Sequence, residues 1–334
     1  MESNKRKNIL VTGGLGFIGW NFIRHLYNQS EIEFERVVNI DSMEYSAINT
    51  FPENSDRYSF YKGKMGEISK SVLEKHNIDI VFNFAAHTHV DNSLKTVIPF
   101  LDNNVLEVGK LIENCKSFWD KRGENGLFVQ ISTDEVFGSL EDQGPFGLPF
   151  NEYSLLHPNN PYSASKASAE LLIRSFVHSY NFPAIITNCS NNYGPGQHNE
   201  KLIPKIISNC LSGKNIPIYG DGLQKRDWIY VDDHCSGIIS AAKNFTKGSS
   251  YLFGTNCSIT NLEITNLVIN RLDFLFPKSS SYKNLLTFVE DRLGHDRNYC
   301  IDYARTMFET GWYPKTSLVE GIDKTVSWYL NKTL

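Results

Sequence analysis

Two adjacent carboxyl groups, Asp134 and Glu135, follow a hydroxyl at Thr133, just after an apolar run over residues 127–131. Adjacent carboxylates repel each other, and a confined, partly dry site pushes their pKa values apart. One of the two would stay protonated and act as an acid, while the other would stay ionised and act as a base. The pattern therefore indicates a site that moves protons on a substrate, with Thr133 hydrogen-bonding the same substrate.

A tyrosine and a lysine, Tyr162 and Lys166, follow at a spacing of four residues. That spacing places both on one face of a helix, and Pro161 suits the first turn of this helix. An ammonium group beside the phenol would lower the pKa of Tyr162 and fit it to take a proton from a hydroxyl group. The pair therefore suits the oxidation of an alcohol.

The N-terminal segment carries a glycine pattern that is typical of dinucleotide-binding loops. Residues 8–12 are expected to form a strand, and Gly13, Gly16 and Gly19 follow it. Such glycines allow a tight turn, the approach of backbone to a pyrophosphate, and close packing of the next helix. Asp41 ends the next expected strand, where a carboxylate binds the adenosine ribose hydroxyls and repels a 2′-phosphate. The sequence therefore predicts NAD rather than NADP as the cofactor.

Short apolar stretches alternate with longer helical patterns through the first half of the chain. Strands separated by helices of this length need crossover connections, which predicts an α/β fold with a doubly wound parallel Rossmann sheet. Ligands of such sheets lie beyond the carboxyl ends of the strands, where the motifs above fall. The expected strands are residues 8–12, 36–40, 80–84, 127–131 and 184–188, and the expected helices are residues 17–29, 68–76, 97–115 and 162–180.

The character of the chain changes after about residue 190, where turn residues become frequent and the elements become shorter. We expect an NAD-binding domain over residues 1–190, to which residues 231–257 return. A smaller α/β substrate-binding lobe is expected over residues 191–230 and 258–334.

The bulk composition favours an ordinary intracellular enzyme. A net charge of -4 gives no reason to expect nucleic acid or an anionic membrane as partner. No signal peptide and no apolar run of membrane-spanning length is present in the sequence, and the six cysteines form no C-x-x-C pair. His87 and His89 lie close together, but no further His or Cys completes a metal geometry, so we expect no metal. These features predict a cytoplasmic location.

The glycine spacing together with the Tyr-x-x-x-Lys pair resembles the extended short-chain dehydrogenase/reductase superfamily. Asn104 lies where that superfamily has a helix-stabilising Asn. Lys64 and Met65 replace an Asp-Ile pair that is usual near the adenine, which leaves an Asp contact to the adenine amine in doubt. The resemblance implies cofactor contacts by Gly13, Gly16, Phe17, Ile18, Gly19, Asp41, Met65, Phe84, Ala85, Ala86, Asn103, Tyr162 and Lys166.

The run from Ser132 to Gly138 (S-T-D-E-V-F-G) resembles the nucleoside-diphosphate-glucose 4,6-dehydratases. Related epimerases lack the acidic pair, and the resemblance extends over almost the whole chain. It implies a lyase that uses bound NAD to take a hydride from C4 of glucose while Tyr162 accepts the hydroxyl proton. Glu135 would then remove the C5 proton and Asp134 would protonate the departing C6 hydroxyl, before the hydride returns to C6. The product would be a 4-keto-6-deoxyglucose nucleotide.

The two phosphates of such a substrate need cations, and arginine can bind phosphate oxygens through two parallel hydrogen bonds. Arg226 and Arg297 match the family pattern for this role, with Lys201 near a helix start. The resemblance implies substrate contacts by Thr88, Thr133, Asn191, Asn192, Lys201, Leu202, Pro217, Ile218, Tyr219, Arg226, Asn261 and Arg297.

Several alternatives stay open. In a nucleotide-sugar 4-epimerase the acidic pair would have no catalytic role. In a non-catalytic NAD-binding sensor neither the acidic pair nor Tyr162 and Lys166 would have one. Parts of the chain look like dTDP-glucose enzymes and others like the UDP-glucose enzymes that feed rhamnose synthesis. The two bases differ by one methyl group, worth about 1 kcal/mol, so we expect both nucleotides to be accepted within about tenfold. Apolar residues on more than one face of the helices at 97–115 and 162–180, together with the resemblance, predict a homodimer.

Overall fold

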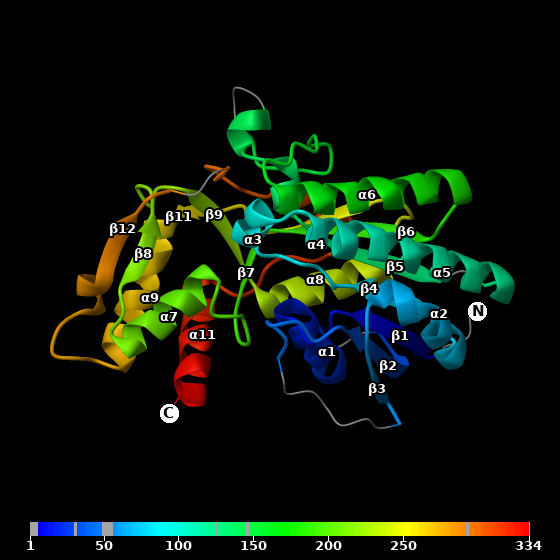
Figure 1. Cartoon of the computed structure of the whole chain (residues 1–334), viewed down its shortest axis with the longest axis horizontal. Helices are drawn as coiled ribbons and strands as arrows, with labels where there is room; N and C mark the ends of the chain where they lie inside the picture. The colour runs from blue at the N-terminus through cyan, green and yellow to red at the C-terminus, as the bar shows by residue number, and fades with distance from the viewer. Residues whose placement is uncertain are drawn as a thin grey trace.

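The largest feature of the computed structural model is a seven-stranded sheet with the strand order β10-β6-β5-β4-β1-β2-β3 (Figure 1). The structure describes residues 6–29, 32–48, 56–124, 126–143, 147–291 and 294–333. All pairs in this sheet are parallel, and the strand order reverses between β1 and β4, which confirms the doubly wound α/β arrangement. The strands are β1 (Lys7–Thr12), β2 (Phe34–Asp41), β3 (Tyr58–Lys62), β4 (Ile80–Asn83), β5 (Leu127–Thr133), β6 (Ala184–Cys189) and β10 (Ser250–Phe253).

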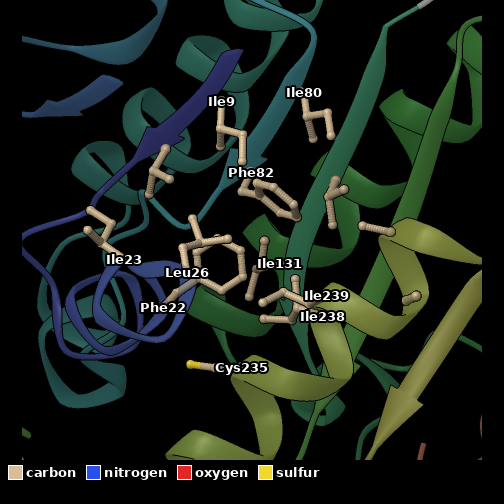
Figure 2. Packing of buried hydrophobic residues seen from close by; sticks show 14 of the residues in the cluster. Ile9, Phe22, Ile23, Leu26, Ile80, Phe82, Ile131, Cys235, Ile238 and Ile239 are labelled. Atoms are coloured by element: carbon tan, nitrogen blue, oxygen red, sulfur yellow. The ribbon is translucent and has the colours of Figure 1, made fainter. Parts of the chain in front are cut away.

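Helices cover both faces of this sheet. Successive strand residues point to opposite faces, so Ile9 packs with Phe22 and Ile238 on one side (Figure 2), while Leu10 packs with Leu73 on the other. The first face is covered by α1 (Phe17–Gln29) and α8 (Val231–Lys243), and the second by α2 (Met65–His76), α5 (Glu107–Arg122) and α6 (Pro161–Tyr180). Because both faces are buried, the inner strands are mainly apolar, and their buried polar residues include Asn83, Gln130 and Asn188.

Two elements differ from the sequence expectation. The strand β3 was not predicted, because it lies at the edge of the sheet and lacks the continuous apolar run of the inner strands. The single helix expected over residues 97–115 is α4 (Ile98–Leu101), a π-helical turn η1 (Asp102–Leu106), and α5. The π turn surrounds Asn104, whose side chain bonds groups outside the helix, and such turns often accompany functional sites.

A second, smaller group of elements lies at the left of Figure 1, beside the carboxyl ends of the large sheet. It contains one three-stranded and one two-stranded sheet, packed with helices around a separate core that includes Ile206, Ile218 and Val268. The strands are β7 (Asn191–Tyr193), β9 (Lys225–Tyr230) and β11 (Ser258–Thr260), and β8 (Ile216–Tyr219) with β12 (Leu286–Val289); the helices are α7 (Leu202–Ser212), α9 (Asn261–Leu275) and α11 (Leu318–Thr333).

The remaining elements are short. The helix α10 (Ala304–Thr310) contacts α8 and β10 of the large sheet. The others are α3 (Val90–Lys95) and the 3-10 turns η2 (Asp134–Phe137), η3 (Leu140–Gln143) and η4 (Tyr282–Leu285). Among the helices that the structure describes, none combines the length and the apolar character needed to cross a bilayer.

Candidate active site

The glycine loop between β1 and α1 lies directly against the backbone that follows β4. Gly13 has a φ of 69°, and a Cβ atom there would lie 2.6 Å from the backbone nitrogen of Ala85. A Cβ atom at Gly19 would lie 2.3 Å from the carbonyl oxygen of Gly13. Neither position has room for a side chain. The loop can therefore turn tightly, and the backbone amides at the start of α1 can approach an anionic group.

Asp41 is held at the end of β2 by two backbone amides. Its Oδ2 accepts the Leu15 N–H at 2.9 Å, and its Oδ1 accepts the Met43 N–H at 2.7 Å. Burial raises the pKa of Asp41, and the two amides oppose that rise. Each carboxylate oxygen can accept a second hydrogen bond, so the side chain is positioned to bind ribose hydroxyls at the cavity that it lines.

A cavity of about 320 Å³ extends from the glycine loop along the carboxyl ends of β2 and β4. Lys64 and Met65 both line it, and the Lys64 Nζ donates to Asp102 Oδ2 at 2.7 Å. The Lys64 ammonium, which stands in the Lys64-Met65 pair that replaces the usual Asp-Ile pair, is therefore paired with the Asp102 carboxylate of the π turn. The predicted cofactor residues that line the cavity are Gly13, Gly16, Asp41, Met65, Phe84, Ala85, Ala86 and Asn103.

A second cavity, of about 230 Å³, shares Gly13, Gly16, Phe84, Ala86 and Thr88 with the first. It lies over the carboxyl ends of β5 and β6 and so brings the glycine loop to the proton-transfer groups. The other predicted residues that line it are Phe17, Ile18, Gly19, Thr133, Asp134, Glu135, Tyr162, Lys166, Asn191, Asn192 and Lys201.

Thr133 organises the turn that carries the acidic pair. The strand β5 runs two residues beyond the expected end and includes Thr133, after which η2 begins. The Thr133 Oγ1 accepts the Glu135 N–H at 3.3 Å and donates to Asp134 Oδ1 at 3.2 Å. The threonine thus caps the turn and fixes both carboxyl groups relative to the strand end.

The two carboxyl groups have different surroundings. Asp134 is 2% exposed, and its Oδ2 has no hydrogen-bond partner among the described residues. Burial raises the pKa of Asp134 well above its ordinary value, and the charges of Glu135 and Asp227 add to the rise. Glu135 is less buried, and its Oε2 accepts a hydrogen bond from Asn160 Nδ2 at 3.4 Å. Asp134 is therefore suited to be the protonated partner of the pair.

The prediction that Lys166 lowers the pKa of Tyr162 was wrong. Burial raises the pKa of Tyr162 well above its ordinary value, and the charges of Glu135 and Asp134 add to the rise. The Lys166 Nζ donates instead to the Ile131 carbonyl oxygen at 2.7 Å. Burial also lowers the pKa of Lys166 to about 8, so its ammonium loses its proton more easily than that of an ordinary lysine but is still the main form near pH 7.

The helix α6, which carries this pair, begins at a well-defined cap. The Asn160 side chain accepts the Ser163 N–H at 2.9 Å, and the Ser163 hydroxyl lies 3.2 Å from the Asn160 nitrogen, which completes a capping box before Pro161. From the neighbouring helix, the Asn104 side chain donates to Ser165 Oγ at 2.9 Å and accepts the His87 N–H at 2.8 Å. The predicted helix-stabilising position of Asn104 thus links α6 to the loop after β4.

The two arginines predicted to bind phosphates lie in different environments. Arg226 is buried on β9, donates to the Asp296 carbonyl oxygen at 2.8 Å, and lies over the ring of Tyr299 at 4.3 Å. Arg297 is half-exposed and forms two parallel hydrogen bonds of 2.9 Å to Asp221. A phosphate would have to compete with that carboxylate for Arg297.

Several predicted substrate residues lie outside both cavities. Ile218 is 2% exposed within the core of the smaller part, so its side chain does not face a ligand, whereas Tyr219 is 40% exposed. Asn261 is held near β9 through its N–H, which donates to the Gln224 carbonyl oxygen at 2.9 Å. The residues that line neither cavity are Leu202, Pro217, Ile218, Tyr219, Arg226, Asn261 and Arg297.

Two groups that contact lining residues of the second cavity, His234 and Asn160, were not predicted as site residues from the sequence. His234 is buried, and its Nδ1 lies 2.9 Å from Asn192 Oδ1, so it orients that amide. Burial lowers the pKa of His234 to about 3, so the ring is neutral. Asn160 directly precedes Pro161, which indicates a helix cap, but its hydrogen bond to Glu135 becomes visible only in the folded structure. Within the described residues, no three His, Cys, Asp or Glu side chains group as a metal site.

Comparison with known proteins places the chain among nucleotide-sugar enzymes. Residues 10–325 match the family described as GDP-mannose 4,6 dehydratase. The dTDP-glucose 4,6-dehydratase of Haemophilus influenzae is 40% identical over 97% of this chain and 98% of its own length. A double mutant of DesIV, the dTDP-glucose 4,6-dehydratase of Streptomyces venezuelae, was solved with NAD and DAU bound. It superposes with a TM-score of 0.86 at 33% identity over 96% of each chain.

A second solved dehydratase agrees, whereas a more distant enzyme shares the fold alone. The dTDP-glucose 4,6-dehydratase of Bacillus anthracis, solved in complex with NAD, gives a TM-score of 0.82 at 37% identity over 97% of each chain. The UDP-glucose 4-epimerase of Thermotoga maritima gives a TM-score of 0.84 at 24% identity, over 98% of this chain and 100% of its own.

Proposed function

The chain belongs to the family of nucleotide-sugar 4,6-dehydratases, and from this premise we propose that Asp134, Glu135 and Tyr162 are its catalytic residues. The protein is a hydro-lyase that converts a nucleoside-diphosphate glucose into its 4-keto-6-deoxy derivative with NAD as cofactor. The observation that carries the proposal is that Oδ2 of buried Asp134 has no partner among the described residues and lies next to Glu135 in the cavity that Tyr162 and the glycine loop share.

The glycine loop and Asp41 together fit a dinucleotide cofactor. Gly13 and Gly19 have no room for a Cβ atom, and the Asp41 carboxylate is fixed at the rim of the adjoining cavity. We assign the pyrophosphate to the glycine loop and the adenosine ribose to Asp41. When bound, NAD supplies the hydride acceptor for C4, the hydride donor for C6 and, through its charged ring, stabilisation of a phenolate at Tyr162.

The protein side chains provide the proton transfers. Tyr162 accepts the proton of the C4 hydroxyl, and Thr133 donates a hydrogen bond to the same oxygen. The C4 ketone makes the C5 proton acidic, and Glu135 removes it. Asp134 gives its proton to the C6 hydroxyl, which leaves as water, and Glu135 returns a proton to C5 after C6 is reduced. Oxidation at C4 and reduction at C6 cancel, so the reaction has no net redox change.

The substrate is proposed to be held across the second cavity. Asn192, oriented by His234, and Lys201, whose Nζ donates to the Thr88 carbonyl oxygen at 3.0 Å, lie at its wall. Arg226 and Arg297 would bind the phosphates from the smaller part of the molecule. We propose dTDP-glucose as the substrate, since the curated relatives that are about 40% identical act on it, with UDP-glucose accepted within about tenfold.

The test of this function is turnover of the two nucleotide sugars. The purified protein is incubated with dTDP-glucose and with UDP-glucose, and the alkali-induced absorbance of a 4-keto sugar is measured. Product with dTDP-glucose is expected, and product with neither nucleotide would reject the assignment. A 4-epimerase would give a galactose nucleotide instead, and a sensor would give no product.

The assembly is proposed to be a homodimer through α4, α5 and α6. Apolar side chains on the outer faces of these neighbouring helices are exposed, among them Ile98 at 67%, Leu106 at 59% and Leu171 at 57%. A two-fold axis would pair these helices in a four-helix contact and cover the side chains. A monomeric mass by light scattering at micromolar concentration would contradict the proposal.

The location is proposed to be cytoplasmic. The six cysteines are unpaired and five of them are buried, which suits a reducing compartment. Nucleotide sugars and NAD are also cytoplasmic metabolites. Fractionation of cells that produce the protein would place the 4,6-dehydratase activity in the soluble fraction.

A further inference from the structure

A fully buried carboxyl group, Glu170, lies on α6 one helical turn after Lys166 and has no part in the mechanism above. Its Oε1 accepts a hydrogen bond from Asn188 Nδ2 at 2.7 Å. The Arg174 guanidinium lies 3.8 Å from its Oε2. A buried carboxyl group without a role in stability or function would be costly to keep.

The contact with Asn188 continues to the catalytic strand. Asn188 is buried on β6, where it pairs in register with Ser132 of β5. Its Nδ2 also donates to the Thr133 carbonyl oxygen at 3.1 Å. One amide group therefore joins Glu170 on α6 to the backbone of the residue that caps the acidic turn.

The charge of Glu170 also bears on Lys166. The groups that act on the Lys166 ammonium are Glu170 on its own helix, Cys189 on β6 and the Ile131 carbonyl on β5. Burial lowers the pKa of Lys166 to about 8, and the strongest opposing influence is the charge of Glu170.

The surroundings of Glu170 support its ionised form. Burial is the largest influence and leaves the pKa of Glu170 raised, while Ser132, Asn188, Arg174 and Lys166 oppose part of that rise. All four are hydrogen-bond donors or cations. They fit a carboxylate rather than a protonated acid.

We propose that Glu170 is a positioning residue, which fixes the strand end at Thr133 through Asn188 and keeps the Lys166 ammonium charged. The inference rests on the proposed roles of Thr133 and Lys166 in catalysis. It assigns two separable effects: a hydrogen-bond effect through Asn188 and a charge effect on Lys166.

The charge effect is tested by the pH profile of kcat in the holoenzyme with dTDP-glucose. In Glu170→Gln, the loss of the negative charge lowers the pKa of Lys166, so the ammonium is lost at lower pH. The alkaline limb of kcat is expected to move to lower pH by roughly one unit, the lower end of the effect of a nearby opposite charge. Glu170→Asp keeps the charge, so its limb is expected to stay at the wild-type pH.

The matched control is Glu107→Gln on α5. Glu107 is also fully buried, and it accepts the Gly66 N–H at 2.8 Å, so this variant loses a buried charge away from Lys166. Its alkaline limb is expected not to move. A limb that stays in place in Glu170→Gln, or that moves equally in Glu107→Gln, would overturn the charge effect.

Asn188→Ala tests the hydrogen-bond effect and carries the proposal if Glu170→Gln does not fold. Removal of the amide frees the Thr133 carbonyl while the Glu170 charge remains. We expect kcat to fall about tenfold at every pH with the limb unmoved, and an unchanged kcat would overturn the positioning role. Wild-type turnover in the same assay tests the proposed function separately.

Discussion

Asp134 and Glu135 are adjacent in the chain, yet Asp134 is enclosed and its Oδ2 bonds no group in the described part of the chain, while Glu135 is partly open and bonded to Asn160. The strand end produces this difference, because Thr133 caps the turn and directs the two side chains into different surroundings. The roles of Asp134 as the acid and Glu135 as the base therefore follow from the backbone conformation of η2. Two predictions test these roles of the acidic pair, a third tests the glycine loop that binds the cofactor, and a fourth tests the buried Lys166.

Asp134→Asn should abolish the elimination of water and retain part of the C4 oxidation. The amide cannot give a proton to the C6 hydroxyl, so kcat for dehydration should fall by about 10²- to 10⁴-fold. The absorbance of NADH on the enzyme after mixing with substrate reports the oxidation that remains. Glu113→Gln, an exposed carboxyl on α5, is the control and should behave as wild type. Dehydration by Asp134→Asn at the wild-type rate would contradict the assigned acid.

Glu135→Gln should stop the exchange of the C5 proton with solvent. The wild-type enzyme in deuterium oxide is expected to place deuterium at C5 of the product, because Glu135 removes and returns that proton. The variant should show about 10²-fold less deuterium incorporation and product formation. Mass spectrometry of the nucleotide sugar measures both. Unreduced incorporation in the variant would assign the base to another group.

Gly13→Ala should lose NAD, whereas Gly213→Ala should keep it. Both glycines have a positive φ, of 69° and 67°, so both substitutions carry a similar backbone strain of about 1 kcal/mol. The new Cβ atom would lie 2.6 Å from Ala85 N at Gly13, but nothing lies within 4 Å at Gly213. The NAD content of the purified proteins distinguishes the two. Equal NAD content in the two variants would show that NAD binding does not depend on the close approach of Gly13 to Ala85.

Lys166→Met should give a dead enzyme that is more stable than wild type near pH 7. The pKa of Lys166 is lowered from 10.5 to about 8 in the folded protein. The unfolded chain therefore binds an extra proton between these values, and stability rises with pH through that window. Below about pH 8 the full penalty is present, worth about 3 kcal/mol. The bond to the Ile131 carbonyl offsets about 1 kcal/mol of it.

Urea unfolding measures this effect. We expect the free energy of unfolding of Lys166→Met to exceed that of wild type by about 2 kcal/mol near pH 7 and the difference to shrink as the pH approaches about 10. A variant that is less stable than wild type near neutral pH would contradict the prediction. It would show that contacts in the folded protein offset the whole free-energy cost of burying the charged Lys166.

The sequence predicted the features that depend on local pattern. The glycine loop, the carboxyl at Asp41 and the strand that carries Thr133 all follow from residues near in the chain, and the inner strands are mainly apolar because both of their faces are buried. The acidic pair could be recognised from its position alone, since parallel strands carry their ligands at their carboxyl ends.

Other features depend on residues that meet only after folding. The raised pKa of Tyr162 comes from burial and from carboxyl groups on another element, so the i,i+4 spacing to Lys166 gave the wrong direction. The π turn at Asn104 follows from its bonds to His87 and Ser165. Glu170 reads in the sequence as an ordinary helix residue, and its burial becomes visible only when α6 packs on β6.

The transfer of isotope within one molecule tests the central claim most directly. The enzyme is given dTDP-glucose with deuterium at C4, mixed with an equal amount of unlabelled dTDP-glucose that carries a heavy carbon label. The account predicts product with deuterium at C6 only in molecules that began with deuterium at C4, because one bound cofactor returns the hydride that it removed. Deuterium that stays at C4, is lost to solvent, or appears in the carbon-labelled molecules would contradict it.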